Sequence, residues 1–213
     1  MAYTPDLDRL LTPGVSIVDG LVTYQIERHL VGDAVLPTGQ VVGCDPLVGR
    51  AGAEPFTVQA PPGRYPLVAS IAVLYRDGTE LQRRVVALQL VVRDQPAVQW
   101  ELALVAGQDP GELGDDDFFG YAVDAGMGTL ADLAAVRALA AWDHERVEDA
   151  YIPAELPEAP VPGLVGAVVD VETGANVVTV TTGWGDGVYP TFVSRGAAGE
   201  VTSFLTDFLV LPD

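Results

Sequence analysis

The sequence predicts a mainly β, α+β fold, with antiparallel sheets in a sandwich-like core and a helical insertion near residues 129–150. Three observations support this class. Short apolar runs separated by Gly and Pro turn signals recur through residues 15–107. A stretch with helical period follows, and alternation returns over residues 164–211. With 213 residues, 49% of them hydrophobic and 19% charged, we expect one domain over residues 1–213.

The β-rich part, residues 15–107, begins with two alternating runs. Alternate positions are apolar in both, which predicts strands with one buried face. The second run ends at the turn signal Pro61-Pro62-Gly63. The apolar positions are Val22, Tyr24 and Ile26 in the first run, and Phe56, Val58 and Ala60 in the second.

The next strands are the most clearly marked. Leu67 to Tyr75 is a continuous apolar run, typical of a strand buried on both faces. The Asp-Gly pair in Arg76-Asp77-Gly78-Thr79 predicts a hairpin. The chain then returns through Leu81 to Val92, and alternation from Val98 to Leu104 predicts a further, half-buried strand.

The acidic and helical part, residues 108–158, changes period. Thr129 to Asp132 resembles a capping box, which predicts Thr129 as the N-cap of a helix with Asp132 in its first turn. Apolar residues at helical spacing lead to Trp142, and the helix either continues or restarts through Val147 and Tyr151. The prolines that follow predict an extended linker: Pro153, Pro157, Pro160 and Pro162.

The C-terminal part, residues 164–211, predicts a four-stranded β meander. Its strands are expected at about 165–171, 177–181, 189–194 and 201–211. Between the second and third strands lies the cluster Gly183-Trp184-Gly185-Asp186-Gly187-Val188-Tyr189-Pro190. Its glycines allow close backbone approach, and we expect the Trp184 ring to be buried.

The net charge and the basic residues restrict the chemistry and the partners that we expect for this protein. The net charge is −19, and all eleven basic residues are arginine, which excludes lysine-based chemistry. Such a chain repels nucleic acid and anionic membranes, but it attracts a basic protein. Residues 108–158 carry 13 acids and 2 arginines, hence −11. A candidate acidic docking patch lies here: Asp109, Glu112, Asp115, Asp116 and Asp117.

These acids are an alternative site for Ca²⁺ or Mg²⁺, but their spacing fits no EF-hand, so we expect a solvated loop and assign neither metal nor cofactor. The single cysteine, Cys44, excludes an intramolecular disulfide and a thiolate zinc site. No signal peptide is evident, and the apolar runs are well below the ~20 residues of a membrane span. We expect a soluble cytoplasmic protein, and the sequence leaves its oligomeric state open.

Catalytic motifs are weak. No Gly-x-Ser-x-Gly elbow, Walker motif or dinucleotide-binding motif occurs, and Cys44, His29 and His144 carry no cue for catalysis. Four aspartates at element ends are candidates for paired acid/base carboxylates, and turn capping is the alternative role for each. They are Asp45, Asp124, Asp186 and Asp207.

Five segments together resemble a bacterial conserved-domain family of unknown function, over about residues 36–211. They are Gly43-Cys44-Asp45-Pro46-Leu47, Pro61-Pro62-Gly63-Arg64-Tyr65-Pro66, Gly120-Tyr121-Ala122-Val123-Asp124-Ala125-Gly126, Gly183 to Pro190, and Thr206-Asp207-Phe208. The resemblance implies one family-wide domain and transfers no activity. It makes Asp124 and Asp186, with Trp184 and Tyr189, the candidate functional corner.

The leading hypothesis is a non-catalytic acidic binding protein that captures a basic protein partner in an immunity-like or regulatory role. The alternative is a carboxylate-based hydrolase, with or without a metal, that uses Asp124 and Asp186. The sequence leaves open whether the protein is an enzyme. Convergence of these two carboxylates in a cleft would favour the hydrolase, and an exposed acidic patch would favour the binding protein.

Overall fold

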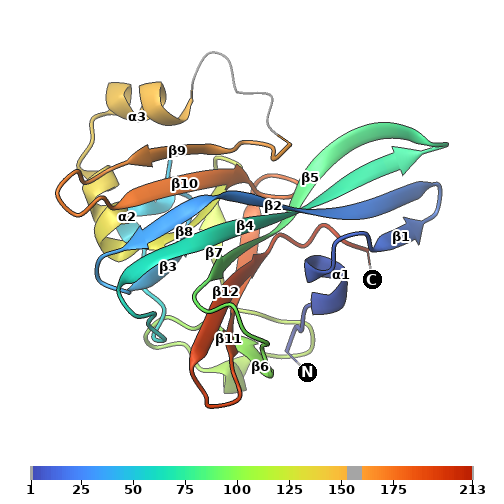
Figure 1. Ribbon diagram of the computed structural model, residues 1–213, viewed down its shortest axis with the longest axis horizontal. Helices are drawn as coiled ribbons and strands as arrows, with labels where there is room; N and C mark the ends of the chain where they lie inside the picture. Colours follow the sequence, from blue (N-terminus) through green and yellow to red (C-terminus); the bar gives the residue numbers. More distant parts are fainter. Residues whose placement is uncertain (1, 153–159, 213) are drawn as a thin grey trace.

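The computed structural model describes residues 2–152 and 160–212, and it confirms the predicted mainly β, sandwich-like α+β class (Figure 1). Two antiparallel sheets form the body. The larger sheet has the order β1-β2-β4-β5-β12-β11-β6, and β7 also pairs with β11. Its strands are β1 (Ser16–Asp19), β2 (Val22–Leu36), β4 (Gly63–Arg76), β5 (Thr79–Val91), β6 (Gln99–Leu102), β7 (Gly120–Val123), β11 (Gly187–Arg195) and β12 (Val201–Asp207).

The smaller sheet has four strands in the order β3-β8-β10-β9. They are β3 (Val41–Cys44), β8 (Met127–Asp132), β10 (Asn176–Thr181) and β9 (Val165–Val168). The helices are α1 (Leu7–Leu11), α2 (Leu133–Ala140) and α3 (His144–Tyr151), with short 3₁₀ turns at Gly49–Gly52 and Pro110–Glu112. Figure 1 shows α2 and α3 at one side of the molecule and α1 at the other.

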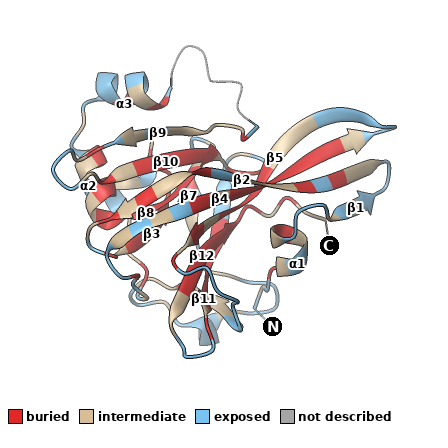
Figure 2. Ribbon diagram, in the orientation of Figure 1, coloured by how far each residue is buried: buried red, intermediate tan, exposed pale blue. Residues whose placement is uncertain are grey.

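The smaller sheet is apolar on both faces because it lies between two layers. Val41, Leu130 and Val180 belong to the core that the two sheets share. Their chain neighbours Val42 and Ala131 instead join a second core with Leu133 to Tyr151 of the helices. Successive side chains of a strand point to opposite faces, so one strand supplies both cores. Figure 2 shows the buried residues concentrated in the middle of the molecule, where strands of the two sheets overlap in this view.

The outer face of the larger sheet is covered by the N-terminal segment, which we define as residues 2–12. The Tyr3 hydroxyl donates a hydrogen bond of 2.7 Å to Asp207 in β12. Arg28 in β2 donates one of 3.2 Å to the Leu11 carbonyl at the end of α1. Cross-strand partners place Arg28, Asp207 and their neighbours on this outer face. The two faces of the sheet therefore have different covers.

The β4–β5 hairpin confirms the prediction from its turn chemistry. Asp77 and Gly78 both have positive φ, at 50° and 75°. A two-residue turn with both φ values positive matches the twist of the flanking strands, which is why Asp-Gly favours it. Leu67 and residues 69–74 of β4 are buried, as the continuous apolar run predicts.

The helical insertion differs from the prediction in its start. Thr129 lies in β8, and its hydroxyl donates to the Val178 carbonyl rather than capping a helix. The N-cap is Asp132, whose carboxylate accepts from the Ala134 amide. Pairing with β3 and β10 keeps residues 127–132 extended, so tertiary contacts override the local capping signal. The helix ends at Ala140 and restarts as α3, with Asp143 as the second N-cap.

Three further expectations are resolved differently. Phe56 to Ala60 is not a strand, since in this run only Phe56 forms an isolated bridge, to Val105. The C-terminal strands form two hairpins and not one meander: β9 and β10 belong to the smaller sheet, whereas β11 and β12 belong to the larger one. The chain changes sheets at residues 182–186. Of the predicted proline linker, residues 153–159 lie outside the described residues.

Candidate functional site

The candidate corner forms where the β7–β11 ladder ends. Val123 of β7 pairs with Gly187 of β11, so Asp124 directly follows the paired end of β7 and Asp186 directly precedes that of β11. The Thr182 amide donates to the Gly126 carbonyl at 2.9 Å, which ties the two loops together. The structure therefore brings Asp124 and Asp186 to the same corner, and both are exposed to solvent.

Glycine and Tyr189 shape the loop that carries Asp186. Gly183 has φ of 43°, and a Cβ there would lie 2.6 Å from the Phe208 carbonyl oxygen, so a larger residue would clash with backbone. The buried Tyr189 hydroxyl donates to the Gly185 carbonyl at 2.7 Å. Its ring packs edge-on against Phe208, with centroids 5.3 Å apart. The loop is thus anchored by Tyr189.

The predicted burial of Trp184 is wrong, because this side chain is 52% exposed. The Arg84 guanidinium lies 4.9 Å from the centre of its ring, and Arg84 also donates to the Gly183 carbonyl. A cation over an indole face is attracted by the ring quadrupole. The corner therefore presents two carboxylates and a half-exposed aromatic ring to solvent.

The other two candidate aspartates are buried and hold loops in place. Asp45 accepts hydrogen bonds from the Leu47 and Val48 amides through one oxygen, and from the Asp124 and Ala125 amides through the other. It therefore positions the loop that carries Asp124. Asp207 accepts from Tyr3 and from the Leu209 amide. Burial raises the pKa of Asp207, and these two hydrogen bonds oppose the rise.

A cavity of about 350 Å³ lies beside the corner, between β3, β7 and the 3₁₀ turn at Gly49–Gly52. Its walls include Cys44, Phe56, Phe119 and Tyr121. Burial, and secondarily the neighbouring Asp45 charge, raises the pKa of the Cys44 thiol to about 12. A thiol with this pKa is protonated at neutral pH and is a poor nucleophile. Asp124 and Asp186 lie outside the lining of this cavity.

The histidines pair elsewhere. His29 Nε2 lies 2.9 Å from a Glu27 carboxylate oxygen, and His144 Nε2 lies 3.2 Å from one of Glu148. Over residues 2–152 and 160–212, no group of three or more His, Cys, Asp or Glu side chains has an arrangement suited to a metal ion.

The acidic docking patch is exposed at all five positions: Asp109, Glu112, Asp115, Asp116 and Asp117. Its loop has defined local structure. Asp109 accepts from the Gly111 amide as an N-cap, and Asp117 accepts from the Gly114 amide. The Tyr3 amide donates to the Asp117 carbonyl, so the N-terminal segment supports this loop.

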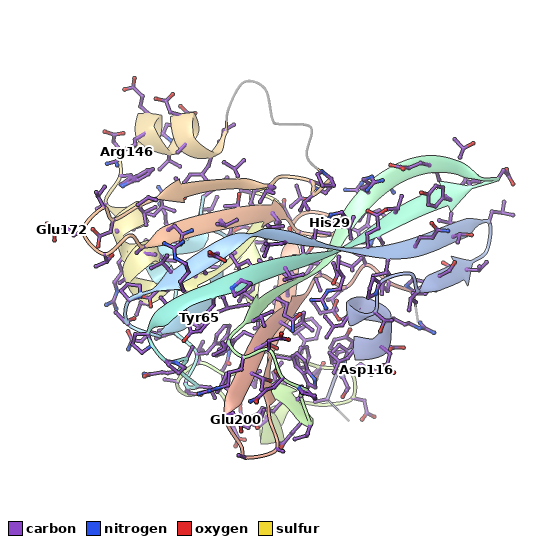
Figure 3. All side chains as sticks on the ribbon, in the orientation of Figure 1. His29, Tyr65, Asp116, Arg146, Glu172 and Glu200 are labelled. Atoms are coloured by element: carbon purple, nitrogen blue, oxygen red, sulfur yellow. The ribbon has the colours of Figure 1, made fainter. Side chains whose placement is uncertain are left out.

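The described acids of residues 108–158 do not form one surface. In Figure 3, Asp116 lies at the lower right, below α1 in this view, whereas Arg146 of α3 lies at the upper left. The helix α3 carries its own exposed acids, at Glu145, Glu148 and Asp149. The docking patch and the exposed acids of α3 are therefore two separate acidic regions.

Sequence reasoning overlooked the outer face of the larger sheet. There Arg28 lies half-buried beneath α1, next to Gln89 and Ser203. No motif marks these residues, because they come from different strands. The only signal in the sequence is an arginine within the alternating run of β2, and strand edges commonly carry such residues.

Comparison with known families places residues 34–206 in a family described as protein of unknown function, DUF4241. The match covers most of the chain, so the protein belongs to this family of unknown function. The curated proteins contain no significant match. The solved structures contain none either. In the part of the chain that the structure describes, no helix combines the length and apolar character needed to cross a bilayer.

Proposed function

We propose that this protein is a non-catalytic binding protein whose acidic surface captures a basic protein partner in an immunity-like or regulatory role. The observation that carries the proposal is the exposed acidic docking patch. Among the described residues, Glu112, Asp116 and Asp117 form no ion pair, whereas several carboxylates elsewhere pair with Arg9, Arg64, Arg83 or Arg195. Their charge is therefore available to a partner.

The loop geometry favours recognition over mere solubility. A patch fixed by Asp109, Asp117 and Tyr3 loses less conformational entropy on binding than a floppy acidic tail. With a net charge of −19, the protein also steers a cationic partner toward itself. Complementary charge raises association rates more than it raises affinity.

The candidate corner supplies a second contact of suitable chemistry. Exposed Trp184 stands near the two carboxylates Asp124 and Asp186, and Arg84 already occupies a cation–π position on its ring. Tryptophan and arginine are enriched among residues that dominate binding energies. A partner arginine or lysine would meet both an aromatic face and negative charge here. No observation favours the hydrolase alternative, since the two carboxylates lie in the open.

The test compares two charge-matched triple variants. One is Glu112→Gln/Asp116→Asn/Asp117→Asn in the docking patch, where the side-chain amide introduced by Asp117→Asn keeps an acceptor for the Gly114 amide. The other is Glu145→Gln/Glu148→Gln/Asp149→Asn on α3, which removes the same charge from the other region. Proteins captured by the parent from native lysate are purified, and their association rates with all three forms are measured at low and high salt.

We expect a basic captured protein whose association slows by about tenfold or more with the docking-patch variant at low salt. The α3 variant should retain most of the parent rate. High salt should reduce the difference, because charges farther apart than the ~8 Å Debye length at physiological ionic strength are screened. Captured partners that are not basic, or equal slowing by both variants, would contradict the proposal.

A further inference from the structure

A second groove lies on the outer face of the larger sheet, beneath the N-terminal segment. It has a volume of about 510 Å³. We name it the arginine groove, because Arg28 and Arg93 both line it. The groove is also lined by Leu7, Leu11, Gln89, Trp100 and Ser203, and by the exposed acids Asp8 and Asp94 at its rim.

Arg28 is the central residue of this groove. Its guanidinium donates to the Leu11 carbonyl and to the Gln89 side-chain oxygen, while its Nε is buried with no hydrogen-bond partner among the described residues. Nor does Arg28 form an ion pair with any carboxylate that the structure describes. In a chain with 30 acids and 11 arginines, a half-buried arginine without a counter-charge is unexpected.

The groups that accept hydrogen bonds from Arg28 are neutral and fixed. The Gln89 amide nitrogen donates to the Ser203 hydroxyl at 3.0 Å, and that hydroxyl lies 2.8 Å from the Ser194 hydroxyl. This chain orients Gln89 so that its oxygen faces Arg28. It adds hydrogen-bonding groups to the groove without neutralising the positive charge, which an anion would do.

The walls and rim restrict which anion fits. Leu7, Leu11 and the partly buried Trp100 offer apolar surface beside the guanidinium. Asp8 and Asp94 at the rim, with the charge of the whole chain, would repel a ligand of high negative charge. A monoanion with an apolar body meets both conditions.

We propose that the arginine groove binds a small organic carboxylate, whose carboxylate pairs with Arg28 and whose apolar body packs against Trp100. A planar guanidinium matches a carboxylate in shape and charge. The Arg93 side chain at the rim adds attraction for the incoming anion. This site is separate from the acidic docking patch, and its failure would leave the proposed function intact.

The experiment uses benzoate as the probe and benzamide as its neutral counterpart of nearly the same shape. Binding to the full chain is followed by calorimetry and by the NMR signals of the Arg28 Nε–H and the Trp100 indole N–H. We expect benzoate to shift both signals and to bind at least about tenfold more tightly than benzamide. That factor corresponds to one charge-assisted hydrogen bond.

The variants are Arg28→Gln, Arg28→Lys and Arg83→Gln. Arg83 is the matched control because it already pairs with Glu27 and Glu80. We expect Arg28→Gln to weaken benzoate binding about ten- to a hundredfold, Arg28→Lys to weaken it less, and Arg83→Gln to leave it unchanged. If Arg28→Gln fails to fold, the NMR shifts of the parent still decide. Equal binding of benzoate and benzamide, or no shift at either signal, would overturn the proposal.

Discussion

Replacing Asp132 by Ala should destabilise this protein far more than an ordinary loss of a helix N-cap. Asp132 is fully buried, and its carboxylate accepts hydrogen bonds from two parts of the chain. The Ala134 amide, at 2.8 Å, is the capping bond of α2. The Thr38 amide, the Thr38 hydroxyl and the Gly39 amide, at 2.8–3.0 Å, belong to the loop between β2 and β3.

The magnitude follows from these partners. Loss of an N-cap side chain costs about 1 kcal/mol. The Gly39 amide is buried and would lose its acceptor, which costs roughly 1–3 kcal/mol. Thr38 is exposed and regains water, so its two bonds add about 1 kcal/mol together. The expected loss is therefore about 3–5 kcal/mol, a large share of the roughly 5–15 kcal/mol that stabilises a typical domain.

Asp143→Ala is the matched control. Asp143 caps α3 through the Arg146 amide at 2.9 Å, and this is the one hydrogen bond of its side chain among the described residues. Its loss should cost about 1 kcal/mol. Urea unfolding followed by circular dichroism gives both free energies of unfolding, provided that the m-values agree. Equal destabilisation by the two substitutions would refute the reasoning, because the tertiary bonds of Asp132 would then contribute nothing.

Three further experiments test the corner and the buried groups. Trp184→Ala should lower the free energy of unfolding by only about 1 kcal/mol, because the Trp184 ring is half-exposed. Tyr189→Ala should lower it by about 3–5 kcal/mol, because the Tyr189 ring is buried against Phe208. Urea titrations that give the reverse order would contradict this prediction. Burial raises the pKa of Asp207, so this carboxyl keeps its proton to higher pH in the folded state than in the unfolded chain. The parent should therefore lose stability relative to the Asp207→Asn variant as the pH rises above ~4. A stability difference that does not change with pH would count against it. Burial raises the pKa of Cys44 from 9.0 to about 12, so iodoacetamide should label it roughly a thousandfold more slowly in the folded protein than in urea; comparable rates would show that the thiol is accessible.

Much of the fold follows from local pattern in the sequence. Leu67 to Tyr75, with the Asp77-Gly78 turn, predicted the central hairpin, because turn conformation and side-chain alternation are properties of a few neighbouring residues. The exposure of the acidic residues at 109–117 was equally predictable, since five acids in nine residues have no apolar face to bury. For the same reason the sequence placed these residues on the surface.

The sites depend on contacts between distant residues, and local pattern carries little information about them. The sequence suggested Asp124 and Asp186 as a pair, but only the β7–β11 register brings them to one corner, and Asp45 holds that corner from 79 residues away. Nothing in the sequence indicated that Arg28 would meet Gln89. Such pairs depend on which strands become neighbours in a sheet.

The sequence by itself determined the β-rich class, the main hairpin and the acidic surface. Tertiary structure decided where α2 begins, which sheet each C-terminal hairpin joins, and which aromatic ring is buried. At Thr129 the capping signal is outweighed by pairing with β3 and β10. At the Gly183 turn the chain changes sheets, which buries Tyr189 and leaves Trp184 in solvent. The physical reason is that capping preferences are worth about 1 kcal/mol, whereas burial of strands and rings is worth several times more.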